Sequence, residues 1–253
     1  MGKGIILVTA TAMEMQVVMQ GLGLNEVAPE PGASLARRVR GIPVRFVCSG
    51  IGPLAAAFIM GCLAGEGALS PARCRGVLSL GIAGTYARHI APIGSVVMAD
   101  AEIWPEYGLL SEHGVDPVAL GFPLMGKKDD VAPPPVWDTL ALNPAAALAA
   151  MGLANPAVAM CMAENPLVVT GAGITVAAVS GTRSRAEELA ARYAALSENM
   201  ESFPLALAAA RLDIPFAEIR SISNLVGDRS KEAWDIPAAL VALSRVSGQV
   251  FSI

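Results

Sequence analysis

The chain has 253 residues, of which 54% are hydrophobic and 16% are charged, and its formal net charge is −4. A chain this apolar can bury a large core, which excludes a disordered protein, and its length fits one α/β domain over residues 1–253. Its 18 Lys and Arg residues form no cluster, which argues against nucleic acid as a partner, because phosphate backbones bind concentrated positive charge.

Two uncharged stretches, residues 139–163 and 165–182, are long enough to span a membrane. Asn143-Pro144 interrupts the first and residues 170–173 interrupt the second, so we predict buried elements of a soluble protein and no membrane partner. The chain begins with a strand pattern instead of a basic-then-apolar leader, which favours the cytoplasm. The cysteines lack CxxC spacing, which predicts free thiols and no metal site; they are Cys48, Cys62, Cys74 and Cys161.

The first predicted element is a strand at residues 4–8, a continuous apolar run typical of a strand covered on both faces. A helix follows it and ends near Gly21, and Thr11 and Glu14 have the spacing of a capping box. Glu14 therefore has two interpretations. It caps a helix, or it stands at the carboxyl end of a strand, where open α/β sheets hold their ligands.

A glycine-rich segment comes next, in which Gly50, Gly52 and Ala55 match the dinucleotide fingerprint G-x-G-x-x-G/A. The fingerprint also requires an acidic residue at the end of the following strand, and the predicted strand 76–80 ends without one. We therefore rank a nicotinamide-dependent oxidoreductase low. The expectation that remains is a set of approachable backbone amides at a helix start.

Residues 81–85 are predicted to form a second small-residue loop at a strand end, so that two such loops give a pocket with a backbone floor. Residues 102–135 are predicted to form a long loop or flap, and loops of this length are usually functional or mobile. Within it, Trp104 and Tyr107 either stack on an aromatic ligand or pin the flap to the body, and we favour pinning. The other predicted strands are residues 35–40, 43–48, 93–101 and 174–179.

The polar segment 197–203 lies between two predicted helices. A carboxylate beside a methionine, at the mouth of a core helix, costs free energy unless it has a partner or a role. We interpret Glu201 as binding a sugar hydroxyl and Met200 as a wall against the ribose. The strand 215–223 ends in Asn224, which we interpret as reading a base. The helices predicted in this half are residues 145–151, 184–196, 203–212 and 234–250.

These residues, in this order, resemble the nucleoside phosphorylase and nucleosidase family over nearly the whole chain. The most specific segments are residues 197–203, 219–227 and 231–240, which are weak singly and strong together. The resemblance implies a three-layer α/β fold with a central mixed, partly barrel-like sheet flanked by helices. It also implies hydrolysis of a purine nucleoside at its N-glycosidic bond, without metal or cofactor, by a homodimer or larger homo-oligomer.

The resemblance also implies roles for individual residues. Glu14 would act as general base on the attacking water, Glu201 would hold the ribose 2′-hydroxyl, and Asn224 would stabilise the departing base. For the 5′ substituent of the ribose, the candidates are Arg183, Arg229 and the flap around Trp104. The further substrate-binding residues that it implies are Met200, Gly84, Ile82, Gly52, Ser180, Gly181, Asn199 and Ser223.

Asn224 occupies the position at which adenine-specific relatives use an aspartate. A neutral amide both donates and accepts, so it can pair with O6 and a protonated N7 of hypoxanthine, whereas an ionised aspartate would repel O6. This residue therefore favours a 6-oxopurine. Ser79 and Ile82 stand where phosphorylases use arginine and often serine, which favours water over phosphate. Ser202 stands where relatives usually have glycine.

Besides the oxidoreductase ranked low above, three alternatives to this activity remain. Within the fold they are an adenine-releasing nucleosidase and a purine nucleoside phosphorylase. Outside enzymes, the chain would be a nucleoside-binding protein that leaves its ligand intact.

Overall fold

The computed structural model describes residues 2–127, 133–157, 166–230 and 233–252; Cys161 and part of the predicted flap lie outside them. Their main element is a nine-stranded mixed sheet. Its strands are β1 (Gly4–Thr9), β2 (Ser34–Val39), β3 (Ile42–Cys48), β4 (Cys74–Thr85), β5 (Val96–Ile103), β8 (Thr139–Ala141), β9 (Val168–Thr175), β10 (Ser197–Asn199) and β11 (Phe216–Leu225). Their order is β10-β9-β5-β11-β4-β1-β3-β2, and β8 pairs with β5.

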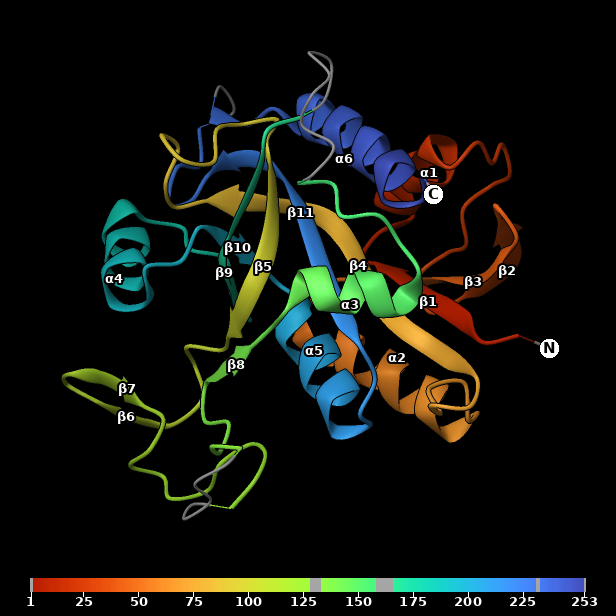
Figure 1. Ribbon diagram of the computed structural model, residues 1–253. Helices are drawn as coiled ribbons and strands as arrows, with labels where there is room; N and C mark the ends of the chain where they lie inside the picture. The colour runs from red at the N-terminus through yellow and green to blue at the C-terminus, as the bar shows by residue number, and fades with distance from the viewer. Residues whose placement is uncertain (1, 128–132, 158–165, 231–232, 253) are drawn as a thin grey trace.

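Part of this sheet closes on itself. Strand β10 runs parallel to β9 on one side and pairs antiparallel with β4 on the other, at Ser197–Thr85 and Glu198–Gly84. The strands β4, β11, β5, β9 and β10 therefore form a ring, from which β1, β3 and β2 extend as an open sheet (Figure 1). The predicted mixed, partly barrel-like sheet is confirmed.

Helices cover both faces of the sheet (Figure 1). In β1, Ile5 and Leu7 pack with residues of α1, α3 and α6, whereas Ile6 and Val8 pack with residues of α2 and α5. A strand that is covered on both sides has no polar face, which explains its continuous apolar run. The helices are α1 (Ala12–Gly21), α2 (Pro53–Gly65), α3 (Pro144–Met151), α4 (Arg183–Tyr193), α5 (Ser202–Arg211) and α6 (Ile236–Val250).

The predicted loop at residues 81–85 is wrong, because these residues continue strand β4. Small residues occur there because side chains from other elements approach the backbone closely. A Cβ atom on Gly81 would lie 2.2 Å from Nη1 of Arg220 and 2.8 Å from Oε1 of Glu14. The glycine makes room for charged groups inside the sheet instead of forming a turn.

The predicted break at residues 170–173 is wrong for the same reason, since they lie within β9. The strand predicted at residues 174–179 is correspondingly displaced, because β9 ends at Thr175. A Cβ atom on Gly173 would lie 2.1 Å from Oε1 of Glu102 on the neighbouring strand. In both segments, glycine therefore allows a charged side chain of another element to approach the strand backbone closely.

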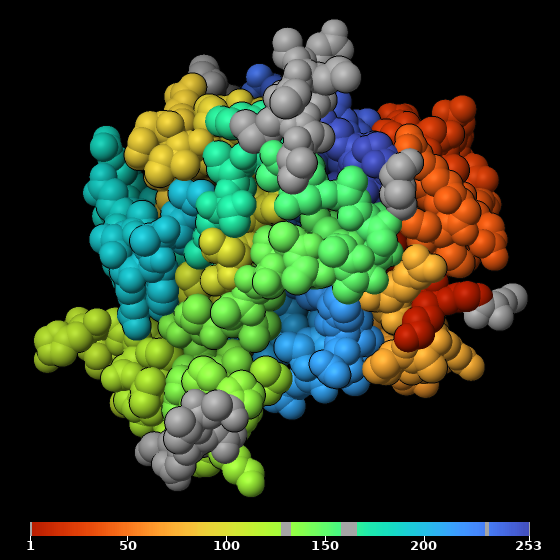
Figure 2. Space-filling model, in the orientation of Figure 1, coloured from red at the N-terminus to blue at the C-terminus, as the bar shows by residue number. Residues whose placement is uncertain are grey.

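The predicted flap at residues 102–135 begins later than expected, since Glu102 and Ile103 belong to β5. A separate hairpin of β6 (Leu109–Ser111) and β7 (Gly114–Asp116) extends from the body (Figures 1 and 2). The Trp104 ring lies 5.9 Å from that of Phe203 in α5, which agrees with the expectation that Trp104 pins this segment. No helix within the described part of the chain is long and apolar enough to cross a membrane.

Candidate active site

A cavity of about 290 Å³ opens where the carboxyl ends of β1, β4 and β11 meet the segments that follow β9 and β10. Glu14, Glu201 and Asn224 all line it, although they come from distant parts of the sequence. Of the other predicted binding residues, Ile82, Gly84, Ser180, Asn199, Met200 and Ser223 line the cavity. Gly52 and Gly181 are not among the residues that line it.

Glu14 is held mainly by its own helix terminus. Its Oε2 accepts hydrogen bonds from the Thr11 amide at 2.9 Å and the Thr11 hydroxyl at 2.8 Å, which forms the predicted capping box. Its Oε1 accepts from the Ile82 amide at 2.9 Å, on strand β4. The two interpretations of Glu14 are therefore compatible, because one oxygen caps the helix while the carboxylate also lines the cavity.

Glu201 is held by a residue far away in the sequence. Its Oε1 accepts a hydrogen bond of 2.9 Å from the amide of Gly52, the residue that precedes helix α2. The start of α2 was predicted to offer its backbone amides to a ligand. Instead, the Gly52 amide binds the Glu201 carboxylate, whose negative charge is stabilised at the positive end of a helix. Gly52 has φ +95°, which a side chain would strain, and it acts on the cavity through Glu201.

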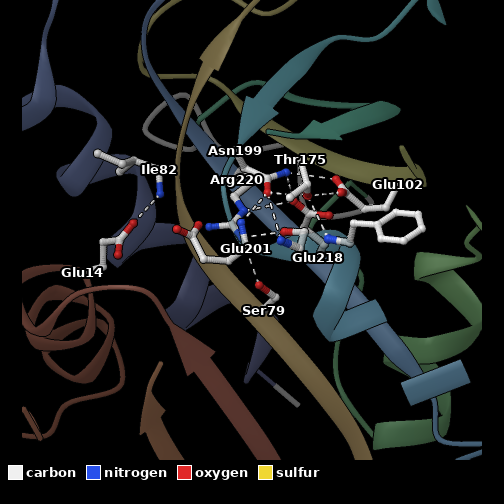
Figure 3. A network of polar contacts seen from close by, with 11 residues as sticks. Glu14, Ser79, Ile82, Glu102, Thr175, Asn199, Glu201, Glu218 and Arg220 are labelled. Carbon is white, nitrogen blue, oxygen red and sulfur yellow. Dashed lines mark hydrogen bonds and ion pairs between the residues drawn. The ribbon is translucent and has the colours of Figure 1, made fainter. Parts of the chain in front are cut away.

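A buried arginine, Arg220, lies between the carboxylates of Glu201 and Glu218. It was not identified from the sequence. Its Nε donates to Glu218 Oε1 at 3.0 Å, and its Nη2 donates to the hydroxyls of Ser202 at 2.6 Å and Ser79 at 3.2 Å. Figure 3 shows the guanidinium between Glu201 and Glu218. Two charged residues at alternate positions of a predicted core strand, Glu218 and Arg220, were the available signal.

The surroundings of Glu201 shift its pKa upward. Burial raises the pKa of Glu201, the positive charge of Arg220 and the hydrogen bond from Gly52 lower it, and the charge of Glu14 raises it, with a net increase. Glu14 and Glu201 are therefore close enough for each charge to act on the other, and Arg220 moderates their repulsion.

Asn224 reaches the cavity through an irregularity in β11. The register between β11 and β4 shifts between Ile222 and Asn224, so β11 holds one extra residue there. Such bulges re-aim side chains, and here both Ser223 and Asn224 line the cavity. Asn224 Oδ1 accepts from the Ser223 hydroxyl at 2.8 Å and its Nδ2 donates to the Leu225 carbonyl at 3.1 Å. Since an amide has two N–H groups and two lone pairs, one of each remains for a ligand.

A second unpredicted carboxylate, Glu198, also lines the cavity but is bound by protein donors. It accepts hydrogen bonds from the Tyr86 hydroxyl at 2.6 Å, the Ser180 hydroxyl at 2.6 Å and the Ser180 amide at 2.9 Å. Burial and then the charge of Glu198 raise the pKa of Tyr86, so the phenol remains a donor. Glu198 therefore fixes the segment after β9. Ser180 lines the cavity, but its hydroxyl donates to Glu198 and not to a ligand.

Much of the cavity wall is apolar, and its charged residues other than the three glutamates are Asp228 and Arg229. Among the described residues that line it, Arg229 bears the only positive charge, and its guanidinium lies 5.2 Å from the ring centre of Trp234. Arg183 lines a neighbouring cavity, and Trp104 lines neither of these two. The described residues contain no group of three His, Cys, Asp or Glu side chains placed to hold a metal ion. The apolar walls are formed by Met13, Ile51, Val179, Met200 and Leu240.

Comparisons with known proteins cover nearly the whole chain. A family model described as the phosphorylase superfamily matches residues 5–251. The futalosine hydrolase of Streptomyces coelicolor is 33% identical over 250 residues, which cover 97% of this chain and 94% of the relative. The futalosine hydrolase of Thermus thermophilus is 31% identical over 85% of each chain.

Solved structures share the fold at low sequence identity. A 5′-methylthioadenosine/S-adenosylhomocysteine nucleosidase from Helicobacter pylori has a TM-score of 0.73 at 16% identity, over 98% of each chain. A mutant futalosine hydrolase from the same organism has a TM-score of 0.68 at 16% identity, again over 98% of each chain. At this identity the likeness concerns the fold alone.

Proposed function

This chain belongs to the phosphorylase superfamily, and from that premise we propose that it hydrolyses the N-glycosidic bond of futalosine. The products would be hypoxanthine and dehypoxanthine futalosine, within menaquinone biosynthesis. Relatives named futalosine hydrolase, 31% to 37% identical, support this activity. The observation that carries the proposal is the meeting of Glu14, Glu201 and Asn224 in one cavity.

The two carboxylates suit a reaction that develops positive charge on a sugar. N-glycosidic bonds break through an oxocarbenium-like state. Glu201 Oε1 accepts the Gly52 amide, and we assign the other oxygen, Oε2, to the ribose 2′-hydroxyl. Glu14 takes the proton of the attacking water, and both negative charges stabilise the ribosyl cation.

The surroundings of Arg220 favour water over phosphate as the nucleophile. The hydroxyl of Ser79, at the position where phosphorylases have arginine, is buried and accepts from Arg220. The charge of Arg220 is balanced by Glu218, Glu201 and Glu14. A phosphate dianion beside Arg220 would be repelled, because three carboxylates surround this single positive charge. A neutral water molecule is not repelled.

Asn224 is proposed to recognise the 6-oxopurine. Its unused N–H and lone pair match O6 and a protonated N7, and the Leu225 carbonyl, which can only accept, fixes the amide orientation by facing Nδ2. An adenine-releasing nucleosidase is the second candidate, in keeping with the fold of the methylthioadenosine nucleosidases, but adenine presents an amino group where Asn224 would meet O6. For the 5′ substituent, the apolar walls and Arg229 suit a benzoate-like group.

Two further properties remain proposals. We propose a homodimer or larger homo-oligomer, because apolar side chains beside the cavity mouth are exposed, among them Met13, Ile51, Leu54 and Phe58. Burying such side chains is the usual driving force of association. We also propose a cytoplasmic location, since the described cysteines, Cys48, Cys62 and Cys74, are free, as is usual in a reducing compartment.

The experiment that tests the activity is an incubation with futalosine, inosine and methylthioadenosine, each with and without phosphate. The proposal predicts hypoxanthine from futalosine at a rate independent of phosphate, and slower release from the other two. Adenine from methylthioadenosine as the preferred product would favour the second candidate. A sugar 1-phosphate would identify a phosphorylase, and an intact nucleoside that stays bound would identify a binding protein.

A further inference from the structure

Behind the cavity floor lies a buried polar cluster that the proposed mechanism does not use. Glu102 of β5 and Glu218 of β11 are both 0% exposed, and neither lines the cavity. Asn199 of β10 and Thr175 of β9 lie between them, and Arg220 supplies positive charge (Figure 3). Two fully buried carboxyl groups beside a single cation require an explanation, because an uncompensated buried charge costs several kcal/mol.

Asn199 connects this cluster to the active site. Its Nδ2 donates to Glu102 Oε1 at 3.0 Å and to Glu218 Oε1 at 3.2 Å, so the two carboxyl groups share one amide. Its Oδ1 accepts from the backbone amides of Glu201 at 3.0 Å and Ser202 at 2.9 Å. The position of the Glu201 backbone therefore depends on Asn199, and the position of Asn199 depends on the carboxyl pair.

The contacts of the Thr175 hydroxyl favour one additional hydrogen in the cluster. Its Oγ1 lies 2.6 Å from Glu102 Oε2 and 2.9 Å from Asn199 Oδ1, and it accepts from the Phe203 amide at 2.8 Å. The orientation of Asn199 is fixed, because Oδ1 faces two backbone amides. Thr175 thus touches two acceptor oxygens with one hydrogen to give. A proton on Glu102 Oε2 resolves this, because Glu102 then donates to Thr175 and Thr175 donates to Asn199.

A second observation shows the same shortage of donors. Glu218 Oε2 is buried and has no hydrogen-bond partner among the described residues. Glu218 Oε1, in contrast, receives both Arg220 and Asn199. Arg220 compensates the charge of Glu218, which leaves no cation for a second carboxylate at Glu102.

We propose that Glu102 is a protonated carboxylic acid at neutral pH and acts as a positioning residue, orienting Thr175 and Asn199 and, through them, Glu201. Burial raises the pKa of Glu102 well above its ordinary value, the charge of Glu218 adds to this, and Thr175 and Arg220 oppose it. The kinetic consequence of this positioning depends on the proposed function, whereas the protonation does not.

The remaining surroundings of Glu102 bring no further charge near it. Its neighbours across β8, β9 and β10 are Leu140, Gly173 and Asn199, none of which titrates. Among the helices packed against β5, α3 contains no charged residue, and α5 and α6 carry only Arg211 and Arg245, both exposed. The titration of Glu102 is therefore governed by Glu218 and Arg220.

The backbone is shaped to receive this side chain. The register between β5 and β9 shifts between Ala99 and Glu102, so that β5 holds one extra residue there. A bulge of this kind turns a side chain into the sheet interior. Opposite it, Gly173 leaves the space that Glu102 Oε1 occupies, since a Cβ there would lie 2.1 Å away.

Glu102→Gln and Glu102→Leu test the proposal together. Glutamine is a neutral analogue that can donate to Thr175 and accept from Asn199, so Glu102→Gln should keep kcat and KM close to wild type. Leucine supplies neither bond, and loss of Glu201 alignment should lower kcat by roughly 10²-fold with a smaller change in KM. Wild-type kcat should fall at alkaline pH as Glu102 loses its proton, and Glu102→Gln should not show that fall.

Infrared spectroscopy gives a readout that does not need activity. Wild type at neutral pH should show the carbonyl stretch of a protonated carboxylic acid, which Glu102→Gln lacks. If the band is present and futalosine is not cleaved, the protonation stands and the proposed function fails. The proposal is overturned if Glu102→Gln keeps the full infrared signal, if it loses as much activity as Glu102→Leu, or if it does not fold, because a neutral amide should replace a neutral acid.

Discussion

The two carboxylates that face the cavity are held in different ways. Glu14 at the start of α1 is bound by Thr11, three residues away, and by the Ile82 amide. Glu201 at the start of α5 is bound by Gly52, which is 149 residues away, and its backbone depends on Asn199. A carboxylate can thus be positioned by a local helix cap, as Glu14 is, or by a hydrogen-bond network that spans several strands, as Glu201 is. The first arrangement should tolerate distant changes that disrupt the second.

The largest expected effect comes from removing either charge. Glu14→Gln and Glu201→Gln should each lower kcat on futalosine by ~10²–10⁴-fold or more, as expected for a lost general base or a lost stabiliser of the cation. Steady-state kinetics checks this, with Glu26→Gln as the control, since that carboxylate is exposed and pairs with Arg37. Near-normal turnover in either active-site variant would remove its assigned role.

The next effect comes from filling the space beside Gly81, into which the Arg220 and Glu14 side chains extend. In Gly81→Ala the new Cβ would displace the Arg220 guanidinium and the Glu14 carboxylate, and a misplacement of about 1 Å can cost roughly 10²-fold in rate. Gly61→Ala in α2 is the matched control, because a Cβ there meets nothing within 4 Å. If the two variants were equally active, the close packing at Gly81 would have no role in catalysis.

Recognition of the base should change by a smaller factor. Asn224→Asp exchanges a donor and acceptor for a carboxylate, which repels O6 and accepts from an amino group. We expect the preference for 6-oxo over 6-amino purines to fall by about tenfold or more, the effect of one hydrogen bond to a charged group. The ratio of kcat/KM for futalosine and its 6-amino analogue measures this. An unchanged ratio would contradict the assignment of Asn224.

The pH profile tests the assigned role of Glu201. The pKa of Glu201 is raised above the ordinary value of 4.5, and only its ionised form can stabilise the sugar cation, so activity should be lost as pH falls through this raised value. The acidic limb of kcat/KM should therefore lie above pH 4.5. The effect of pH on stability has the opposite direction. The folded state holds the Glu201 proton more tightly than the unfolded state, so the free energy of unfolding falls as pH rises from 4.5 through the raised pKa. An acidic limb at or below the ordinary value would contradict this.

The smallest expected effect is on the local arrangement. Thr11→Ala removes the cap and one hydrogen bond to Glu14, which should lower the free energy of unfolding by ~1 kcal/mol. The Thr11 and Ile82 amides still hold the carboxylate, so activity should fall only a few-fold. Denaturant unfolding and initial rates measure the two quantities. A loss as large as that of Glu14→Gln would show that the cap is not a minor support.

The same contrast explains which features could be predicted from the sequence. The capping box of Glu14 and the apolar run of β1 are local patterns, and both were predicted correctly. Asn224 was proposed because it follows a predicted strand, and it does line the cavity. The Gly52–Glu201 bond and the Glu102–Glu218 pair depend on how distant strands align, and no local pattern encodes that alignment. Glycine-containing segments were predicted as loops because a close approach and a turn leave the same signature.

The fold-level prediction succeeded through family resemblance more than through periodicity. Closure of the sheet by β10 rests on three residues, Ser197–Asn199, which are too short to be recognised as a strand from their pattern. Those residues were predicted as a functional segment because of Glu201, which follows them. Their structural part in closing the barrel and in holding Glu201 emerged only from the pairing with β4 and β9.

The most direct test of the account is a crystal structure of Glu14→Gln with intact futalosine bound. It should place the ribose 2′-hydroxyl on Glu201, the O6 and N7 edge of the base on Asn224, and a water molecule between residue 14 and the anomeric carbon. A base bound away from Asn224, or a ribose with no contact to Glu201, would contradict it.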